Sequence, residues 1–299
     1  MSLLNNIIVS VVQLMPKPVV RFFSNRYIAG DLLTDAVRLT RELNKKGIYS
    51  TIDVLGEAIT TKEEAINAHR QCLEVLESIH REKLMSNLSI KPTQMALQID
   101  FDFCVKQVRE LCTKAKEYGT FVRLDMEDAT TTDDILRLHR ILRSEFDNVG
   151  VVIQAYLRRT VKDILEQKDV ALNYRLCKGI YIEAEEIAFK GRGEIQENYL
   201  LSLRKMFEAG AYVGIATHDI YLIEGAKKII KEMNIDSARY EFQMLLGVKE
   251  DLRDKLNAEG FKVRIYVPFG KDWYKYSIRR LKENPQVAGH IVKNIFSLN

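Results

Sequence analysis

The chain has 299 residues, of which 46% are apolar and 29% are charged, and its formal net charge is +4. This composition excludes a disordered or collagen-like chain, and no uncharged apolar stretch reaches the roughly 18 residues that a membrane-spanning helix needs. The net charge is too small to indicate a nucleic-acid partner, and the length fits one α/β barrel as well as two average domains.

The basic excess lies at the two ends of the chain. Residues 1–26 carry +3 and residues 262–299 carry +6, which leaves −5 for residues 27–261. The apolar start of the chain lacks a basic first segment and a small-residue cleavage site, so it does not predict a secretory signal. We expect a short helix packed on the main domain, with contact to a membrane surface as the alternative.

Four cysteines are scattered along the chain without a C-x-x-C pair: Cys72, Cys104, Cys112 and Cys177. This spacing predicts neither a zinc site nor a disulfide framework. We expect the cysteines to pack as small apolar side chains in a reducing, cytoplasmic compartment, and no metal site is predicted.

Strand-like and helix-like segments alternate after an expected helix over 33–46. The predicted strands are rich in β-branched and aromatic residues, and several read as continuous apolar runs, which is typical of strands buried on both faces. They are Tyr49–Leu55, Ser86–Ile90, Phe121–Asp125, Val149–Leu157, Tyr174–Gly179, Tyr212–Thr217, Tyr240–Leu245 and Lys262–Val267. The predicted helices are 62–81, 102–118, 133–144, 160–167, 183–209, 221–233, 249–258 and 271–284, with Asp133 and Thr160 as N-caps.

Eight strands alternating with eight helices predict a parallel (β/α)8 barrel of the TIM type. We expect residues 1–46 to form an N-terminal helical extension packed on the barrel, and residues 47–299 to form the barrel itself, as one domain overall. The alternative is an open doubly wound sheet, which would normally carry a G-x-G-x-x-G turn after its first strand. Gly191-Arg192-Gly193 lacks the third glycine and lies in a helical region.

Polar side chains gather where the predicted strands end. In such a barrel the active site lies at the carboxyl ends of the strands, so these residues predict a polar pocket for a charged small molecule. The alternative is that each forms a buried salt bridge or a loop cap. They include Asp53, Lys91, Arg123, Asp125, Gln154, Arg175, Lys178, Thr217, His218, Glu241, Gln243, Arg264 and Tyr266.

Two adjacent arginines follow in the last predicted helix. Arg279 and Arg280 can hold one carboxylate from two directions, and Glu283 is spaced to orient them. Forked, charge-assisted hydrogen bonds explain why arginine would be used here in place of lysine. A solvated basic face is the alternative.

The order of these motifs resembles the proline dehydrogenase family. Tyr266-Val-Pro-Phe-Gly270, then Trp273, Tyr276 and Arg279-Arg280-x-x-Glu283-Asn284, is similar to the family's C-terminal signature. The likeness covers roughly residues 27–285, and the chain looks like a monofunctional bacterial type. Its upstream motifs are Asp53-Val-Leu-Gly-Glu57, Lys91-Pro92-Thr93, Arg123-Leu-Asp125-Met-Glu127-Asp128, Gln154-Ala-Tyr156, Arg175-Leu-Cys-Lys-Gly-Ile-Tyr181, Ala216-Thr217-His218 and Tyr240-Glu-Phe-Gln243-Met.

The resemblance implies an oxidoreductase acting on CH–NH donors, with FAD lying across the carboxyl ends of the strands. L-proline would be oxidised to Δ1-pyrroline-5-carboxylate by hydride transfer from C5 to the flavin N5. Arg279, Arg280 and Lys91 would hold the substrate carboxylate. The remaining implied substrate-site residues are Tyr266 on the proline ring, Asp125 and Tyr181 in the pocket wall, Glu283, and Glu57, which would pair with Arg280 and close the pocket.

The resemblance also implies the cofactor contacts. Arg175 would approach the flavin N5 edge, Gln154 would bond the isoalloxazine, and Thr217 and His218 would lie further out. Glu241 and Lys178 are also assigned to the cofactor. Residues 182–200 do not match the threonine-rich stretch of better-known members, so no adenosine-side contacts are assigned.

The implied electron acceptor is a membrane quinone, which would give residues 1–26 a use as a peripheral contact at the inner face of the membrane. A separate pyrroline-5-carboxylate dehydrogenase would receive the product. An ion pair between Lys91 and Asp125 would leave neither free as a base.

Two other functions compete with this interpretation. A Schiff-base aldolase on the same barrel would use Lys178 as its nucleophile. A barrel-derived binding protein that has lost its chemistry would carry neither flavin nor activity.

Overall fold

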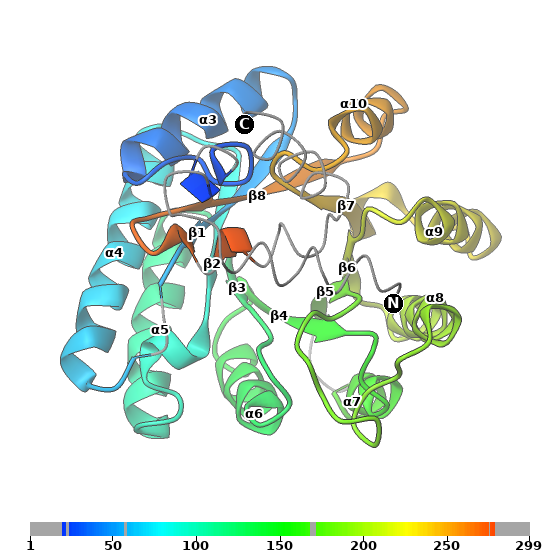
Figure 1. The fold of residues 1–299 in the computed structure, drawn as a ribbon, viewed down its shortest axis with the longest axis horizontal. Coiled ribbons are helices and arrows are strands. Elements are labelled where there is room, and N and C mark those ends of the chain that lie inside the picture. Colours follow the sequence, from blue (N-terminus) through cyan, green and yellow to red (C-terminus); the bar gives the residue numbers. More distant parts are fainter. Residues whose placement is uncertain (1–19, 22–23, 57–58, 168–171, 275, 279–299) are drawn as a thin grey trace, which may run out of the picture.

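The fold is a closed barrel of eight parallel strands in chain order (Figure 1). The computed structural model describes residues 20–21, 24–56, 59–167, 172–274 and 276–278. Helices surround the strands on the outside of the barrel. The predicted (β/α)8 architecture is confirmed, and the open doubly wound sheet is excluded because β1 pairs with β8.

All eight predicted strands form, with bounds that differ from the expected ones by up to three residues. The strands are β1 (Tyr49–Val54), β2 (Ser86–Ile90), β3 (Val122–Leu124), β4 (Val149–Gln154), β5 (Asn173–Cys177), β6 (Tyr212–Ala216), β7 (Tyr240–Leu245) and β8 (Val263–Phe269). The helices are α3 (Leu33–Lys45), α4 (Lys62–Arg81), α5 (Phe101–Glu117), α6 (Thr132–Arg143), α7 (Thr160–Glu166), α8 (Arg192–Glu208), α9 (Ile220–Glu232) and α10 (Glu250–Ala258). Two short 3₁₀ turns are η1 (Pro92–Met95) and η2 (Ser237–Arg239).

Three predictions about helix ends were wrong. The helix expected over 183–209 begins only at Arg192, after Gly191, whose N–H donates to the Glu194 carboxylate at 3.0 Å. Asp133 is not an N-cap, since α6 already begins at Thr132. Thr160 is the first residue of α7, and its hydroxyl donates to the carbonyl of Gln154 at 2.5 Å. Within the helix expected over 271–284, residues 273–274 and 276–278 are helical, and residues 275 and 279–284 lie outside the described part of the chain.

The two faces of the barrel strands differ in chemistry. Outward-facing residues pack with the helices in one apolar core; they include Ile52, Leu88, Ile90, Leu124, Val151, Ile153, Leu176, Val213, Ile215, Phe242, Met244, Ile265 and Val267. Inward-facing residues are largely polar and contact one another across the barrel. Arg175 of β5, for example, donates to Ser89 of β2 at 3.2 Å.

The expectation of continuous apolar strands therefore needs correction. The strands are buried on both faces, but their inner residues are held by hydrogen bonds to each other, which is how buried polar groups are normally accommodated. On β2 the alternation runs through Asn87, Ser89 and Lys91, which share one side of the strand because side chains alternate with a period of two.

Glu241 and Arg264 form an ion pair in the amino-terminal half of the barrel interior. Arg264 Nε lies 2.6 Å from Glu241 Oε1, and Arg264 Nη2 lies 3.1 Å from Oε2. Lys262 Nζ lies 3.3 Å from the same carboxylate. Burial alone would raise the pKa of Glu241, but the charge and hydrogen bonds of Arg264 hold that pKa below its usual value.

Three of the four cysteines fit the expected role of small buried apolar side chains, and Cys177 is only partly buried. Cys72, Cys104 and Cys112 are buried and unpaired, and burial raises the pKa of each thiol to about 12. Among the described residues, no group of three or more His, Cys, Asp or Glu side chains could hold a metal ion. Within the same ranges, no helix is long and apolar enough to cross a membrane.

We predict that Glu241→Gln changes both the size and the pH dependence of stability. The lowered pKa means that the stabilisation from this carboxylate is present above its ordinary pKa of 4.5 and is lost as the pH falls below that value. The variant leaves Arg264 buried without its partner, which costs about 3–5 kcal/mol at pH 7. Urea unfolding between pH 3 and pH 7 measures both effects, and the variant should lose less stability on acidification than the wild type.

Glu77→Gln is the matched control, because Glu77 is exposed on α4. It should leave the unfolding free energy within about 0.5 kcal/mol of the wild type. An acid dependence of Glu241→Gln equal to that of the wild type would contradict the assignment.

Candidate active site

Lys91 and Asp53 form an ion pair at the carboxyl ends of β1 and β2. Lys91 Nζ lies 2.8 Å from Asp53 Oδ1 and 2.9 Å from Oδ2, and the Asp53 side chain is 1% exposed. Burial alone would lower the pKa of Lys91, but the carboxylates of Asp53 and Asp125 raise it above its ordinary value. The lysine is therefore a fixed cation. Its ion-pair partner is Asp53, which corrects the suggested pair with Asp125.

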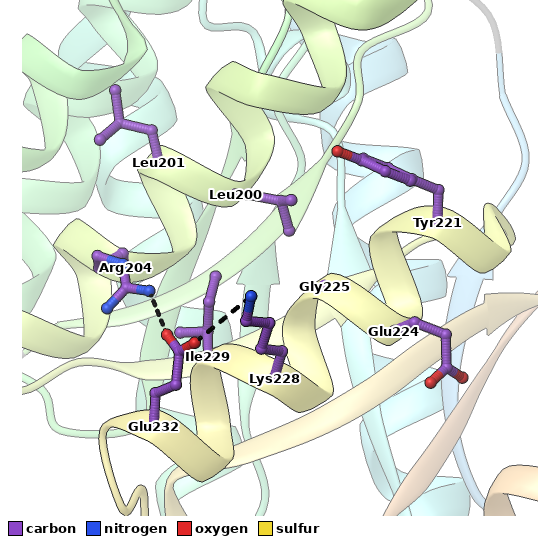
Figure 2. A pocket seen from close by; sticks show the side chains of 9 residues that line it. All are labelled: Leu200, Leu201, Arg204, Tyr221, Glu224, Gly225, Lys228, Ile229 and Glu232. Carbon is purple, nitrogen blue, oxygen red and sulfur yellow. Dashed lines mark hydrogen bonds and ion pairs between the residues drawn. The ribbon is translucent and has the colours of Figure 1, made fainter.

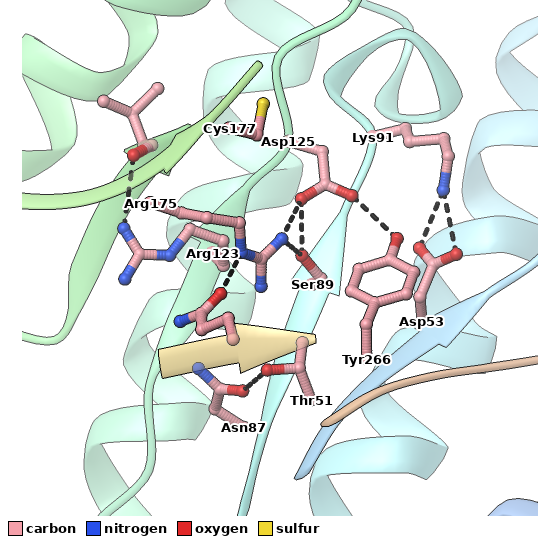
Figure 3. Close-up of polar contacts among 12 residues, drawn as sticks. Thr51, Asp53, Asn87, Ser89, Lys91, Arg123, Asp125, Arg175, Cys177 and Tyr266 are labelled. Carbon is pink, nitrogen blue, oxygen red and sulfur yellow. Dashed lines mark hydrogen bonds and ion pairs between the residues drawn. The ribbon is translucent and has the colours of Figure 1, made fainter. Parts of the chain in front are cut away.

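Asp125 accepts three hydrogen bonds just beyond β3 (Figure 3). Oδ1 accepts from Arg175 Nη1 at 2.7 Å and from the Ser89 hydroxyl at 2.6 Å, and Oδ2 accepts from the Tyr266 hydroxyl at 2.8 Å. Burial raises the pKa of Tyr266 well above its usual value, so the phenol remains a donor. Asp125 thus joins β2, β5 and β8 in one hydrogen-bonded cluster.

Together, these residues make a defined group, which we call the mouth cluster: Asp53, Ser89, Lys91, Asp125, Arg175 and Tyr266. Their side chains come from five strands and meet at one end of the barrel (Figure 3). Asp125 and Arg175 neutralise each other, and so do Lys91 and Asp53. Neither Asp125 nor Lys91 is available as a strong base.

Gln154 brings an unsatisfied acceptor to the same end of the barrel. It is the last residue of β4 and only 3% exposed, yet its side-chain oxygen Oε1 has no hydrogen-bond partner among the described residues. A buried amide oxygen without a donor is costly. An N–H group of a bound ligand would satisfy it.

The remaining assigned cofactor residues lie beside β5, β6 and β7. Thr217 follows β6 and its hydroxyl accepts from the N–H of Asp219 at 3.1 Å. His218 Nε2 accepts from the N–H of Leu245 at 2.9 Å, which ties the β6 loop to β7. Lys178 is exposed one residue beyond β5. Tyr181, which was assigned to the wall of the substrate pocket, is half-buried in the loop between β5 and α8.

Glu241 is placed differently from the other assigned cofactor residues. It lies near the start of β7, is 2% exposed, and binds Arg264 in the barrel interior. These contacts give it a structural role, and a direct contact with the cofactor stays a prediction.

Four assigned residues lie outside the described part of the chain: Glu57, Arg279, Arg280 and Glu283. Their roles in holding the substrate carboxylate and closing the pocket stay predictions.

Asp53 and Gln243 were predicted only as polar residues at the strand ends, and Ser89 was not predicted as a site residue. The available signal was the period of two along each strand. Ser89 lies two residues before Lys91, so both side chains share the inner face of β2. A serine in that position within a buried strand indicates a hydrogen bond across the barrel.

The mouth of the barrel fits a flavin better than a metal. Gln154 offers an acceptor to a ring N–H, and Arg175 donates through Nε and Nη1 while Nη2 has no hydrogen bond to any described residue. A flavin ring carries both N–H donors and carbonyl acceptors along one edge. Gln154 and Arg175 could therefore both bond its polar edge.

A separate surface pocket of about 560 Å³ lies between α8 and α9 (Figure 2). Its lining includes Leu200, Leu201 and Tyr221, and Glu232 at one end pairs with Arg204 at 2.7 Å. No residue of the mouth cluster lines it. It is therefore a feature of the helix ring and not of the strand ends.

Comparisons with known proteins identify the family of this chain. The family model described as proline dehydrogenase matches residues 36–293. Proline dehydrogenase 1 of Bacillus subtilis (strain 168) is 34% identical over 275 residues, which are 92% of this chain and 91% of that protein. Proline dehydrogenase of Deinococcus radiodurans is 34% identical over 277 residues, covering 91% of this chain and 89% of that protein.

A solved structure shares the fold as well. Proline utilization A from Bdellovibrio bacteriovorus, inactivated by N-propargylglycine, superposes with a TM-score of 0.82 at 25% identity. The match covers 87% of this chain but only 32% of that one, so this chain spans about a third of its length. On the family match and the identities over nine-tenths of the sequence, the chain belongs to the proline dehydrogenase family.

Proposed function

We propose that this chain oxidises L-proline to Δ1-pyrroline-5-carboxylate with FAD as its cofactor and a quinone as the final electron acceptor. The observation that carries the proposal is the mouth cluster, a set of fixed charges at the strand ends beside the unsatisfied Gln154. In a barrel of this family, these groups would bind an amino acid carboxylate and the polar edge of a flavin.

Lys91 is suited to bind the substrate carboxylate. Two of its N–H groups face Asp53, and its side chain is 19% exposed, which leaves the third donor accessible. Arg279 and Arg280 would bind the same carboxylate, with Glu283 orienting them, and Glu57 would close the pocket against Arg280. Fixing the carboxylate at several points sets the direction of the proline C5–H bond, which is how positioning lowers the barrier.

The cluster restricts the protonation state of the substrate. The proline nitrogen must be neutral, because an ammonium has no electron pair to form the imine. Since Asp125 is held by Arg175 and Lys91 by Asp53, the proton must leave before the substrate settles in the pocket or pass to solvent. When bound, the flavin supplies the hydride acceptor. Tyr266, whose hydroxyl donates to Asp125, would pack on the proline ring, and Tyr181 would shape the pocket wall.

Gln154 and Arg175 would hold the isoalloxazine, and Thr217 and His218 would contact the cofactor further out. Lys178 is exposed one residue past β5 and would contact only the parts of the cofactor that lie away from the isoalloxazine. We further propose that residues 1–46 form an extension of the single catalytic barrel 47–299. Residues 1–26 would touch the inner face of the membrane where the quinone is reduced, and a separate pyrroline-5-carboxylate dehydrogenase would take the product.

The aldolase alternative is less well supported. A Schiff-base lysine is activated by desolvation or a neighbouring cation, but Lys178 is exposed and lies near the carboxylate of Asp219.

The visible spectrum tests the proposed function. The purified protein should be yellow, and L-proline without an acceptor should bleach the flavin band. N-propargylglycine, the inactivator named for the Bdellovibrio protein, should block that bleaching after incubation. A colourless protein that cannot be loaded with FAD, or a flavin that proline does not reduce, would reject the proposal.

We predict that Gln154→Leu weakens FAD binding while leaving the flavin-free protein at least as stable as the wild type. The change removes a buried acceptor that lacks a donor, and it removes a hydrogen bond to the flavin worth about 1–1.5 kcal/mol. The dissociation constant measured by reconstitution should rise about tenfold. Gln107→Leu, at a buried glutamine on α5, is the matched control. Equal losses of FAD affinity in both variants would contradict the assignment.

We predict that Lys91→Met separates substrate binding from stability. Alone, it leaves Asp53 buried without its cation, which should lower the unfolding free energy by about 3–5 kcal/mol. Adding Asp53→Asn should restore most of that loss. The double variant should still show a KM for proline raised about tenfold or more, since a charged contact to the substrate is gone. A double variant with the wild-type KM would show that Lys91 serves Asp53 alone.

A further inference from the structure

Arg175 is hydrogen-bonded to Gln243, a residue outside the mouth cluster. Its Nε donates to Gln243 Oε1 at 2.6 Å, while its Nη1 donates to Asp125 at 2.7 Å. Arg175 and Gln243 are only 7% and 6% exposed. Two short bonds on two nitrogens fix the plane of the guanidinium and leave Nη2 for a ligand.

Gly214 makes the contact between Arg175 and Gln243 possible. In the sheet, Gly214 of β6 is the register partner of Arg175 on one side and of Glu241 on the other. A Cβ atom at position 214 would lie 2.3 Å from Gln243 Nε2 and 2.7 Å from its Cδ. The Gln243 amide therefore occupies the space that a side chain on β6 would fill, and only glycine leaves that space open.

Glu241 fixes which way the Gln243 amide faces. Gln243 Nε2 donates to Glu241 Oε1 at 2.7 Å, and Glu241 is itself paired with Arg264. Because the NH₂ group is taken by a carboxylate, the oxygen must face Arg175. If the amide were flipped, its NH₂ group would face the guanidinium, which offers no acceptor.

We propose that Gln243, seated over Gly214 and oriented by Glu241, is a positioning residue that fixes Arg175 and so sets the redox equilibrium of the bound flavin. The inference rests on the proposed function, because it needs a flavin at the mouth of the barrel. It assigns Glu241 an indirect role, through Gln243 and Arg175, in place of a contact with the cofactor.

Gln243 would act on the flavin through electrostatic preorganisation of Arg175. A cation held in one orientation in a buried site stabilises negative charge that develops on a neighbouring group without reorganising first. If Arg175 loses its Nε acceptor, its remaining bonds are to Ser89 and Asp125, and the guanidinium can turn toward that carboxylate. Its charge is then neutralised more fully and directed less toward the flavin.

The test is the equilibrium of flavin reduction in Gln243→Leu, followed by spectroelectrochemical titration of the flavin-loaded protein. We expect reduction to become about tenfold less favourable, which corresponds to about 30 mV for a two-electron couple. Arg175→Met should show the full effect. The double variant should match Arg175→Met alone, because residues that act through one another are not additive.

Two further variants separate positioning from folding. Gln243→Asn keeps the amide but is one methylene too short to join Arg175 to Glu241, so it should shift the equilibrium in the same direction even if Gln243→Leu fails to fold. Gln107→Leu removes an equally buried glutamine on α5 and should lower thermal stability at most, with the wild-type redox equilibrium.

The outcomes distinguish this inference from the proposed function. A flavin that proline still reduces, with a redox equilibrium unchanged in Gln243→Leu and Gln243→Asn, overturns the inference alone. Additive shifts in the double variant also overturn it, since Gln243 would then act without Arg175. A wild-type protein that binds no flavin overturns both.

Discussion

The structure depends on one constraint, which is that the polar interior of the barrel must satisfy its own hydrogen bonds. Water is largely excluded there, so each buried charge needs a partner or it destabilises the fold. The solution is a continuous chain of contacts along the barrel axis, from Arg264 through Glu241 and Gln243 to Arg175 and Asp125. The mouth cluster is the end of this series of contacts that lies at the carboxyl ends of the strands.

The alternation of strands and helices could be predicted from the sequence because it depends on the local pattern of apolar residues. Eight apolar segments with intervening amphipathic stretches predict a barrel whatever fills its interior. The resemblance then pointed to Lys91, Asp125, Arg175 and Tyr266, which the structure brings together. Helix ends were predicted less well, as at α8, because a cap depends on local hydrogen bonds that the apolar period does not contain.

The ion-pair partners of the buried charged residues could not be predicted from the sequence. Lys91 could reach either of two carboxylates, and the choice of Asp53 follows from the register of β1 against β2, in which Asp53 lies opposite Ser89. Gly214 is a similar case. A glycine in a strand indicates a close approach of some kind, but only the arrangement of three strands shows that the approaching group is the amide of Gln243.

The division of the sheet into an apolar outer face and a polar inner face has a consequence for engineering. The outer residues pack on the helices and supply the hydrophobic stabilisation, while the inner residues set the charges at the mouth. Under the proposed role of Gln243, heat resistance and flavin reduction can be adjusted at different positions of the same strand. On β7, Phe242 and Met244 serve hydrophobic packing and Gln243 orients the charge at the mouth, while Glu241 contributes to both.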